Sequence, residues 1–190
     1  MSESRYLKYS EAMTKRFGKK VYKIPINLPV TCPNRDGNLS VGGCTFCGAV
    51  GTGFESMDNM ISIAEQFEKT AVYIGKKYKA EGFIAFLQNF SNTYLPLERF
   101  EAYLKDVESL NVLGISISTR PDCIAPAYLA VLKEYQERNR WHVTMEYGLQ
   151  SVNYHTLDRI NRGHGLAEFI EAIQMTREYG FETCAHLIPN

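Results

Sequence analysis

The sequence lacks long apolar runs, a net charge and, over most of its length, histidine. No apolar run approaches the roughly 18 residues that a membrane-spanning helix needs, and the polar N-terminus has no signal-peptide core. We therefore expect a single domain over residues 1–190, located in the cytoplasm and without a membrane partner. The 21 basic and 21 acidic side chains cancel, so the overall charge does not favour a polyanionic partner.

One stretch departs from this balance, within and just after an N-terminal extension over residues 1–19. Seven basic residues and one acid lie between positions 5 and 23. The pattern is typical of a solvated basic helix, and it is also the kind of stretch that contacts RNA phosphates. Charge alone leaves both interpretations open. The basic residues are Arg5, Lys8, Lys15, Arg16, Lys19, Lys20 and Lys23.

Short β-rich apolar runs alternate with amphipathic stretches along the chain. Because strands joined by helices form right-handed βαβ units, this order predicts an α/β fold with a parallel sheet. We expect the functional loops at the carboxyl ends of its strands. The predicted strands are 20–28, 83–88, 112–118, 142–147 and 181–188, and the predicted helices are 58–79, 96–110, 126–138, 153–160 and 167–179.

The last predicted strand ends with the chain, which would leave a bare sheet edge. We expect from this that the sequence is the N-terminal part of a longer protein.

The five cysteines argue for metal or catalytic thiols rather than a disulfide framework, because their number is odd and the chain is expected to be cytoplasmic. Eleven residues separate Cys32 from Cys44, and Cys47 completes a C-x₂-C pair in a glycine-rich loop over residues 29–57. No histidine precedes position 142, so a local Cys₃His zinc site has no histidine to use. Spacing alone leaves two options: zinc with a fourth thiol from Cys123 or Cys184, or a 4Fe–4S cluster with one open iron.

The segment KVYKIPINLPVTCPNRDGNLSVGGCTFCG resembles the cluster loop of the radical S-adenosylmethionine (SAM) superfamily. The usual superfamily pattern is C-x₃-C-x-φ-C, and the wider spacing found here is typical of its YhcC/YtqA-like subgroup, related to the Elongator catalytic subunit. The resemblance implies a partial (β/α)₆ TIM-like barrel whose last strand or strands are missing. It also implies SAM and a 4Fe–4S cluster held by Cys32, Cys44 and Cys47, with Phe46 near the SAM adenine.

Further segments extend the resemblance along the chain: FLQNFSNTY, ISISTRPDCI, MEYGLQS, INRGHG and HLIP, the last resembling a fifth strand. By this resemblance Arg162 would pair with the SAM carboxylate, a task suited to a planar guanidinium. The residues alone also allow two interpretations without a role in SAM binding: Glu146 as an ion-paired buried carboxylate and Arg162 as a surface arginine. The implied SAM-binding residues are Phe46, Gln88, Asn89, Ser118, Glu146, Gln150 and Arg162.

The resemblance implies reductive cleavage of SAM to a 5′-deoxyadenosyl radical, with an electron from flavodoxin or ferredoxin. Kinship with the Elongator-like group points to tRNA wobble-uridine modification. The alternative is a non-catalytic binding module stabilised by zinc or a cluster. We interpret Cys123 and Cys184 as inert thiols and leave the roles of His164 and His186 open.

Overall fold

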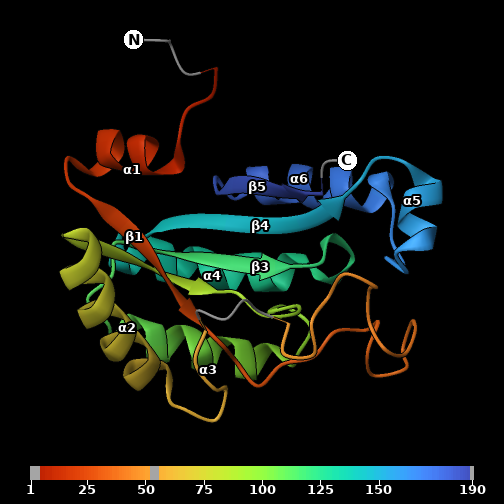
Figure 1. Ribbon diagram of the computed structural model, residues 1–190, viewed down its shortest axis with the longest axis horizontal. Helices are drawn as coiled ribbons and strands as arrows, with labels where there is room; N and C mark the ends of the chain where they lie inside the picture. The colour runs from red at the N-terminus through yellow and green to blue at the C-terminus, as the bar shows by residue number, and fades with distance from the viewer. Residues whose placement is uncertain (1–4, 52–55, 189–190) are drawn as a thin grey trace.

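A computed structural model describes residues 5–51 and 56–188 of the chain. Five parallel strands form one twisted sheet in the order β1-β2-β3-β4-β5 (Figure 1). Within the described residues the sheet is open, with β1 and β5 at its edges, as expected for part of a parallel barrel. The strands are β1 (Val21–Ile26), β2 (Gly82–Leu87), β3 (Gly114–Thr119), β4 (His142–Gln150) and β5 (Glu182–Leu187).

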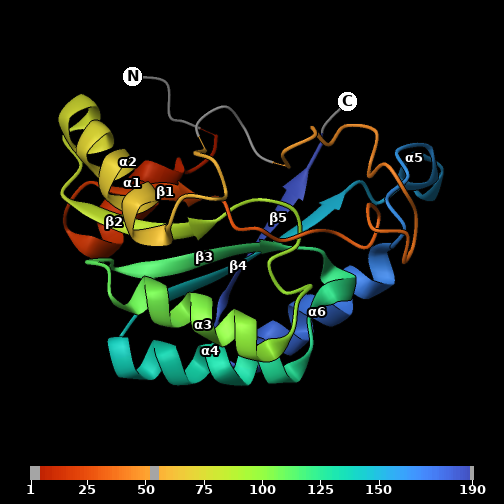
Figure 2. The same ribbon diagram turned by 90° about the horizontal axis from the view of Figure 1, so that it is seen from below.

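Helices follow the strands in the predicted order. Figure 2 shows α3, α4 and α6 on one face of the sheet and α1 on the other. No helix among the described residues is long and apolar enough to cross a membrane. The helices are α1 (Tyr9–Phe17), α2 (Ile63–Tyr78), α3 (Leu97–Glu108), α4 (Pro126–Asn139), α5 (Tyr154–Arg159) and α6 (Leu166–Glu178), with a 3₁₀ turn η1 (Pro121–Cys123).

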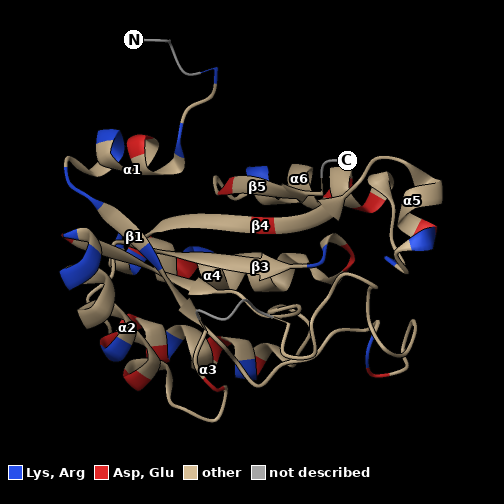
Figure 3. Ribbon diagram, in the orientation of Figure 1, with Lys and Arg blue, Asp and Glu red and all other residues tan. Residues whose placement is uncertain are grey.

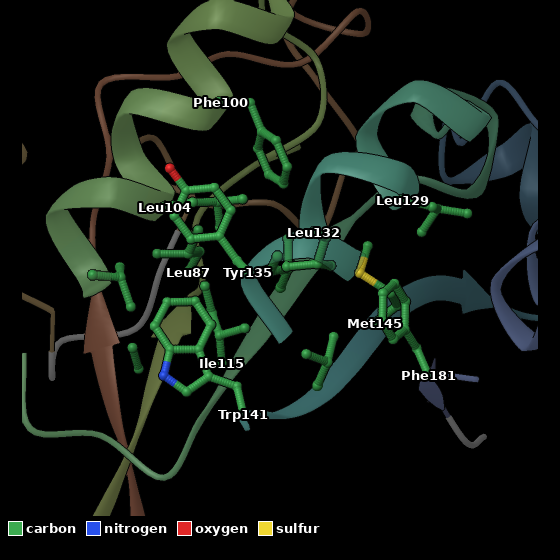
Figure 4. Close-up of a cluster of buried hydrophobic side chains, with 14 of the residues drawn as sticks. Leu87, Phe100, Leu104, Ile115, Leu129, Leu132, Tyr135, Trp141, Met145 and Phe181 are labelled. Atoms are coloured by element: carbon green, nitrogen blue, oxygen red, sulfur yellow. The ribbon is translucent and has the colours of Figure 1, made fainter. Parts of the chain in front are cut away.

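The main core lies between the sheet and the outer helices (Figure 4). Phe100 and Leu104 of α3 are four residues apart, so they share the face that packs on the sheet. Tyr135 and Trp141 stack with ring centroids 6.2 Å apart at the end of α4. Burying each such side chain contributes about 1.5–3 kcal/mol to folding.

The helix α1 packs on the inner face of the sheet, the face that the other helices leave open. Its buried Met13 contacts Val21 of β1 and Ile84 of β2. Charged residues concentrate on the helices rather than the strands (Figure 3). Only part of the basic N-terminal stretch is a helix: Lys15 and Arg16 lie on α1, whereas Lys23 lies on β1. Nor is this part entirely solvated, since Arg16 pairs with Glu182 of β5.

Two element boundaries differ from the prediction by more than two residues. The helix α2 begins at Ile63 rather than Asp58, because the Asp58 carboxylate accepts a hydrogen bond from the Met60 amide and forms a turn. Ser62 then caps the helix through the amide of Glu65, at 3.3 Å. The strand β4 continues past the predicted residue 147 as far as Gln150, which extends it to the edge where the loops gather.

Candidate functional site

A cavity of about 550 Å³ opens at the carboxyl ends of the strands, under the cysteine loop. Residues 52–55 of the predicted 29–57 loop, and Pro189 of the HLIP segment, lie outside the described residues. Every predicted site residue except Asn89 lines the cavity. These are Cys32, Cys44, Phe46, Cys47, Gln88, Ser118, Glu146, Gln150 and Arg162.

The three loop cysteines are free thiols that converge on this cavity. Cys32 and Cys44 are buried, whereas Cys47 is half-buried. A tight turn brings the last two together, because the Cys47 amide donates to the Cys44 carbonyl at 2.9 Å. Neither Cys123 nor Cys184 is among the residues that line the cavity, in the part of the chain that the structure describes.

Asn34 anchors the start of the cysteine loop to a segment that is distant in sequence. Its fully buried side-chain amide donates to the carbonyls of Asn161 at 2.6 Å and Arg162 at 3.0 Å. The same nitrogen lies 3.5 Å from Cys44 Sγ. Sequence reasoning missed this residue; its only signal was a short polar side chain two residues after the first cysteine of a loop.

Asn161 anchors the other end of the loop. Its side-chain amide donates to Ser40 Oγ at 2.8 Å and to the Gly43 carbonyl at 3.0 Å. The backbone adds a further bond, from the Thr45 amide to the Ile160 carbonyl at 3.0 Å. The INRGHG segment thus anchors the cysteine loop through these hydrogen bonds. We call the hydrogen bonds made by the side chains of Asn34 and Asn161 the asparagine clamp.

Arg162 is buried, so the interpretation as a surface arginine is wrong. Its Nη2 and Nε donate to the Gly148 carbonyl at 2.6 and 3.2 Å, and its Nη1 lies 3.5 Å from Cys44 Sγ. Gly148 is required for this approach, since a Cβ there would lie 2.6 Å from the guanidinium nitrogen. The end of β4 therefore fixes the orientation of Arg162 beside the cysteines.

Arg120 of the TRPD segment contacts the backbone of Arg162 and helps to hold it in place. It is 1% exposed and forms a two-point ion pair with Asp122, at 2.9 and 2.7 Å. Its remaining Nη1 donates to the Arg162 carbonyl at 2.8 Å. The TRPD and NRGH segments are thus one connected unit.

Gln88 and Asn89 directly follow β2, and only the first of them lines the cavity. Gln88 lines the cavity and accepts a hydrogen bond from Ser56 Oγ at 3.2 Å. Asn89 is fully buried away from the cavity lining, and its amide exchanges two hydrogen bonds with the backbone of Leu28, at 2.6 and 2.9 Å. The structure therefore does not bring Asn89 to the place predicted for it.

Glu146 is an ion-paired buried carboxylate that also lines the cavity. It pairs with Lys23, accepts from Ser116 Oγ and accepts from His186 Nε2 at 2.8 Å. Burial raises the pKa of Glu146, but the hydrogen bond from His186 and the charge of Lys23 outweigh it and lower the pKa to about 2. The carboxylate is therefore ionised at neutral pH.

The structure also describes the surroundings of His164, whose role the sequence leaves open, and of Cys123 and Cys184, which we interpret from the sequence as inert thiols. Burial, followed by the charge of Arg162, lowers the pKa of His164 to about 4, so this imidazole is neutral. Burial raises the pKa of the Cys123 thiol to about 11, which supports the interpretation as an unreactive thiol. Cys184 is half-buried on β5 next to His186.

Comparisons with known proteins agree with this geometry. The model of the radical SAM superfamily matches residues 26–190. The chain is 36% identical over 177 residues to the protein YhcC of Escherichia coli, covering 93% of this chain and 56% of YhcC. It is 36% identical over 188 residues to the uncharacterized protein YtqA of Bacillus subtilis, covering 98% of this chain and 58% of YtqA. The chain thus spans slightly more than half the length of these relatives.

More distant likeness extends to two further proteins. Elongator complex protein 3 of Saccharomyces cerevisiae is 28% identical over 122 residues, which cover 64% of this chain and 21% of that protein. A solved structure, native anSMEcpe with bound AdoMet and Cp18Cys peptide, superposes with a TM-score of 0.51 at 16% identity. That match covers 87% of this chain and 42% of the other and shows a shared fold. The chain therefore belongs to the radical SAM superfamily of enzymes, whose cofactors are a 4Fe–4S cluster and SAM.

Proposed function

We propose that Cys32, Cys44 and Cys47 hold the 4Fe–4S cluster, that SAM binds in the cavity beside them, and that SAM is cleaved reductively to methionine and a 5′-deoxyadenosyl radical. The observation that carries this proposal is the convergence of the three thiols on one cavity. Six further residues that the superfamily resemblance marks for SAM line the same cavity: Phe46, Gln88, Ser118, Glu146, Gln150 and Arg162.

The spacing of the thiols supports a cluster over a single zinc ion. Zinc–sulfur bonds of about 2.3 Å would bring three sulfur ligands to within about 4 Å of one another. The sulfurs of Cys32, Cys44 and Cys47, all in the described part of the chain, do not form a group within 4.8 Å of one another. Ligands of a four-iron cluster bind different irons, so they suit a wider spacing, and three of them leave one iron for SAM.

The chain's own contribution is to orient SAM and to exclude water. Arg162, fixed by Gly148 and directed at Cys44, would hold the SAM carboxylate next to the cluster. Phe46 offers an apolar ring to the adenine, and Gln88 and Gln150 offer amides for its polar groups. When bound, the cluster and SAM supply the electron and the carbon-centred radical, which are cofactor chemistry.

We further propose that the radical serves tRNA wobble-uridine modification and that flavodoxin or ferredoxin supplies the electron. Support for tRNA comes from resemblance to the Elongator-like group and from exposed basic residues on α1, among them Lys15. The test is fluorescence anisotropy with unmodified tRNA. Binding that weakens steeply with salt would support the proposal, and an absence of binding at low salt would contradict it.

The cluster and SAM proposal is tested by anaerobic reconstitution with iron and sulfide, followed by EPR of the dithionite-reduced protein with and without SAM. We expect a reduced 4Fe–4S signal that SAM perturbs and that Cys44→Ala abolishes. Cys123→Ala is the matched control, since this thiol lines a different pocket and should leave the signal intact. Tightly bound zinc without an iron signal would instead establish the structural metal module.

A further inference from the structure

Polar side chains from four strands meet on the inner face of the sheet, where α1 and the cysteine loop also lie. They are Lys23 of β1, Ser116 of β3, Glu146 of β4 and His186 of β5. All of them except Ser116 line the same cavity as the three loop cysteines. We call these four residues the inner polar cluster.

Three donors from other strands occupy the carboxylate of Glu146 within this cluster. One oxygen accepts from Lys23 and Ser116, and the other accepts from His186. The side chain is 3% exposed. Glu146 therefore has little capacity left for a ligand, and its effect is to hold the Lys23 ammonium and the His186 ring in place.

The two groups that Glu146 holds are cations that reach the cavity. The Lys23 and His186 side chains are 23% and 46% exposed. Lys23 Nζ lies 4.8 Å from the ring centroid of Tyr9 and 4.7 Å from that of Phe86, which restricts its position further. The hydrogen bonds to Cys184 and then to Glu146 raise the pKa of His186 to about 9, so its ring is charged at neutral pH.

The neighbouring groups do not cancel this charge. Tyr9 of α1 has a raised pKa, chiefly through burial, and stays neutral. Glu182 of β5 is the next carboxylate on this side, and the ion pair with Arg16 already neutralises it. Burial lowers the pKa of the neighbouring His142, so that ring adds no charge. Two cations thus face one carboxylate, and the cluster carries an excess positive charge.

A bound metal ion is a poorer explanation of the same residues. Ligand atoms of Glu146, Cys184 and His186 do lie within 4.8 Å of one another. A metal there would replace the hydrogen bond from His186 to Glu146, and it would lie beside the ammonium of Lys23 on the same carboxylate, which repels a cation. It would also need a neutral His186, and the contacts of this ring favour its charged form.

We propose that Lys23 and His186 bind an anionic oxygen of the substrate, carried by a phosphate or a carboxylate group. A paired ammonium and imidazolium, pre-oriented by a buried carboxylate, offer charge-assisted hydrogen bonds to such an oxygen. The inference rests on the proposed function in one respect: it takes this cavity as the place where the substrate is held.

The test uses the reconstituted, oxidised protein with and without saturating SAM. Inorganic phosphate is the probe, and its binding is followed by ³¹P NMR line broadening. We expect Lys23→Met and His186→Gln each to weaken phosphate binding at least fivefold. Lys76→Met and His155→Gln are matched controls on exposed positions of α2 and α5, and they should bind phosphate like the wild type. Competition by acetate distinguishes the two groups that could carry the anionic oxygen. Tighter binding of acetate indicates a carboxylate on the substrate, and tighter binding of phosphate indicates a phosphate group.

Three results would overturn the inference. One is phosphate binding that neither variant weakens, and another is displacement of phosphate by saturating SAM, which would assign the two cations to SAM. The third is stoichiometric zinc that His186→Gln removes. His186 lies on an edge strand and is half exposed, so its variant should fold, as circular dichroism would verify. Loss of the EPR signal with phosphate binding retained would count against the proposed function and leave this inference standing.

Discussion

The side-chain amide of Asn34 donates a hydrogen bond to the carbonyl of Asn161 at 2.6 Å, across 127 positions of sequence. Asn161 returns the contact through its own amide to the Gly43 carbonyl at 3.0 Å. Cys44 lies directly after Gly43, and Asn34 lies two residues after Cys32. This asparagine clamp therefore fixes both ends of the eleven-residue interval that separates the first two cysteines.

Asn34→Ala should loosen the cysteine loop. It removes two hydrogen bonds from a fully buried site and leaves the carbonyls of Asn161 and Arg162 without this donor. We expect a stability loss of about 1–3 kcal/mol and a several-fold faster loss of iron from the reconstituted protein to a chelator. Chelation kinetics and thermal unfolding measure the two effects.

The control for this experiment lies in the same loop. Asn38→Ala removes an exposed amide whose partner is the Tyr94 hydroxyl at 3.0 Å, so iron release should stay at the wild-type rate. Equal rates in Asn34→Ala and Asn38→Ala would show that the clamp does not hold the cluster.

Gly148→Ala should impair SAM binding while leaving the cluster in place. The added Cβ would lie 2.6 Å from both Arg162 Nη2 and Gln150 Nε2, so both side-chain ends must shift and the guanidinium moves relative to Cys44. We expect about tenfold weaker SAM binding, the equivalent of about 1.4 kcal/mol, measured by isothermal titration of the reconstituted protein. Gly75→Ala on α2 is the control, since its Cβ would meet only Phe83 at 3.9 Å. Unchanged SAM affinity in Gly148→Ala would remove both Arg162 and Gln150 from the proposed SAM site.

Asp122→Asn should destabilise the fold through Arg120. The guanidinium is 1% exposed, and the substitution leaves it buried without its countercharge. Removing one partner of a buried pair costs about 3–5 kcal/mol, which urea unfolding would measure. The exposed pair Lys133–Glu137, with side chains 37% and 68% exposed, provides the control. Glu137→Gln should change stability by less than about 0.5 kcal/mol, and an equally small effect of Asp122→Asn would contradict the structural role of the pair.

Local patterns in the sequence were sufficient for the order of the strands, whereas the SAM-binding residues of the cavity came from the resemblance to the radical SAM superfamily. Parallel βαβ order follows from alternating apolar runs, and it brings the loop cysteines, Gln150 and Arg162 to one edge of the sheet. Asn89 was misplaced because its neighbour Gln88 is the residue that faces the cavity. A shift of one position between them decides which amide reaches the cavity and which binds Leu28.

The inner polar cluster could not be predicted for a different reason. Lys23 lies in an otherwise apolar strand, and nothing in its neighbours shows that it faces Glu146, 123 residues away. That pairing depends on the twist of the sheet and on α1 packing across its inner face. Such long-range contacts leave no periodic signal in the sequence.

The pKa shift of His186 predicts a loss of stability on the alkaline side. Its folded pKa of about 9 lies above the ordinary value of 6.5, so its pairing stabilises the fold fully below pH 6.5 and is lost as the pH rises through 9. Because the ring is 46% exposed, solvent screening reduces the effect to about 1 kcal/mol. The pKa values of Glu146 and His164, about 2 and about 4, leave both groups unchanged in this window.

Urea unfolding of wild type and His186→Gln at pH 6.5 and pH 9.5 measures this contribution. The wild type should lose about 1 kcal/mol more than the variant between the two pH values, because glutamine does not titrate. His155→Gln serves as the control and should follow the wild type, since this histidine is exposed on α5. Parallel pH profiles for wild type and His186→Gln would mean that Glu146 does not hold a charged imidazolium. The inner polar cluster would then lack one of the two cations on which anion binding depends.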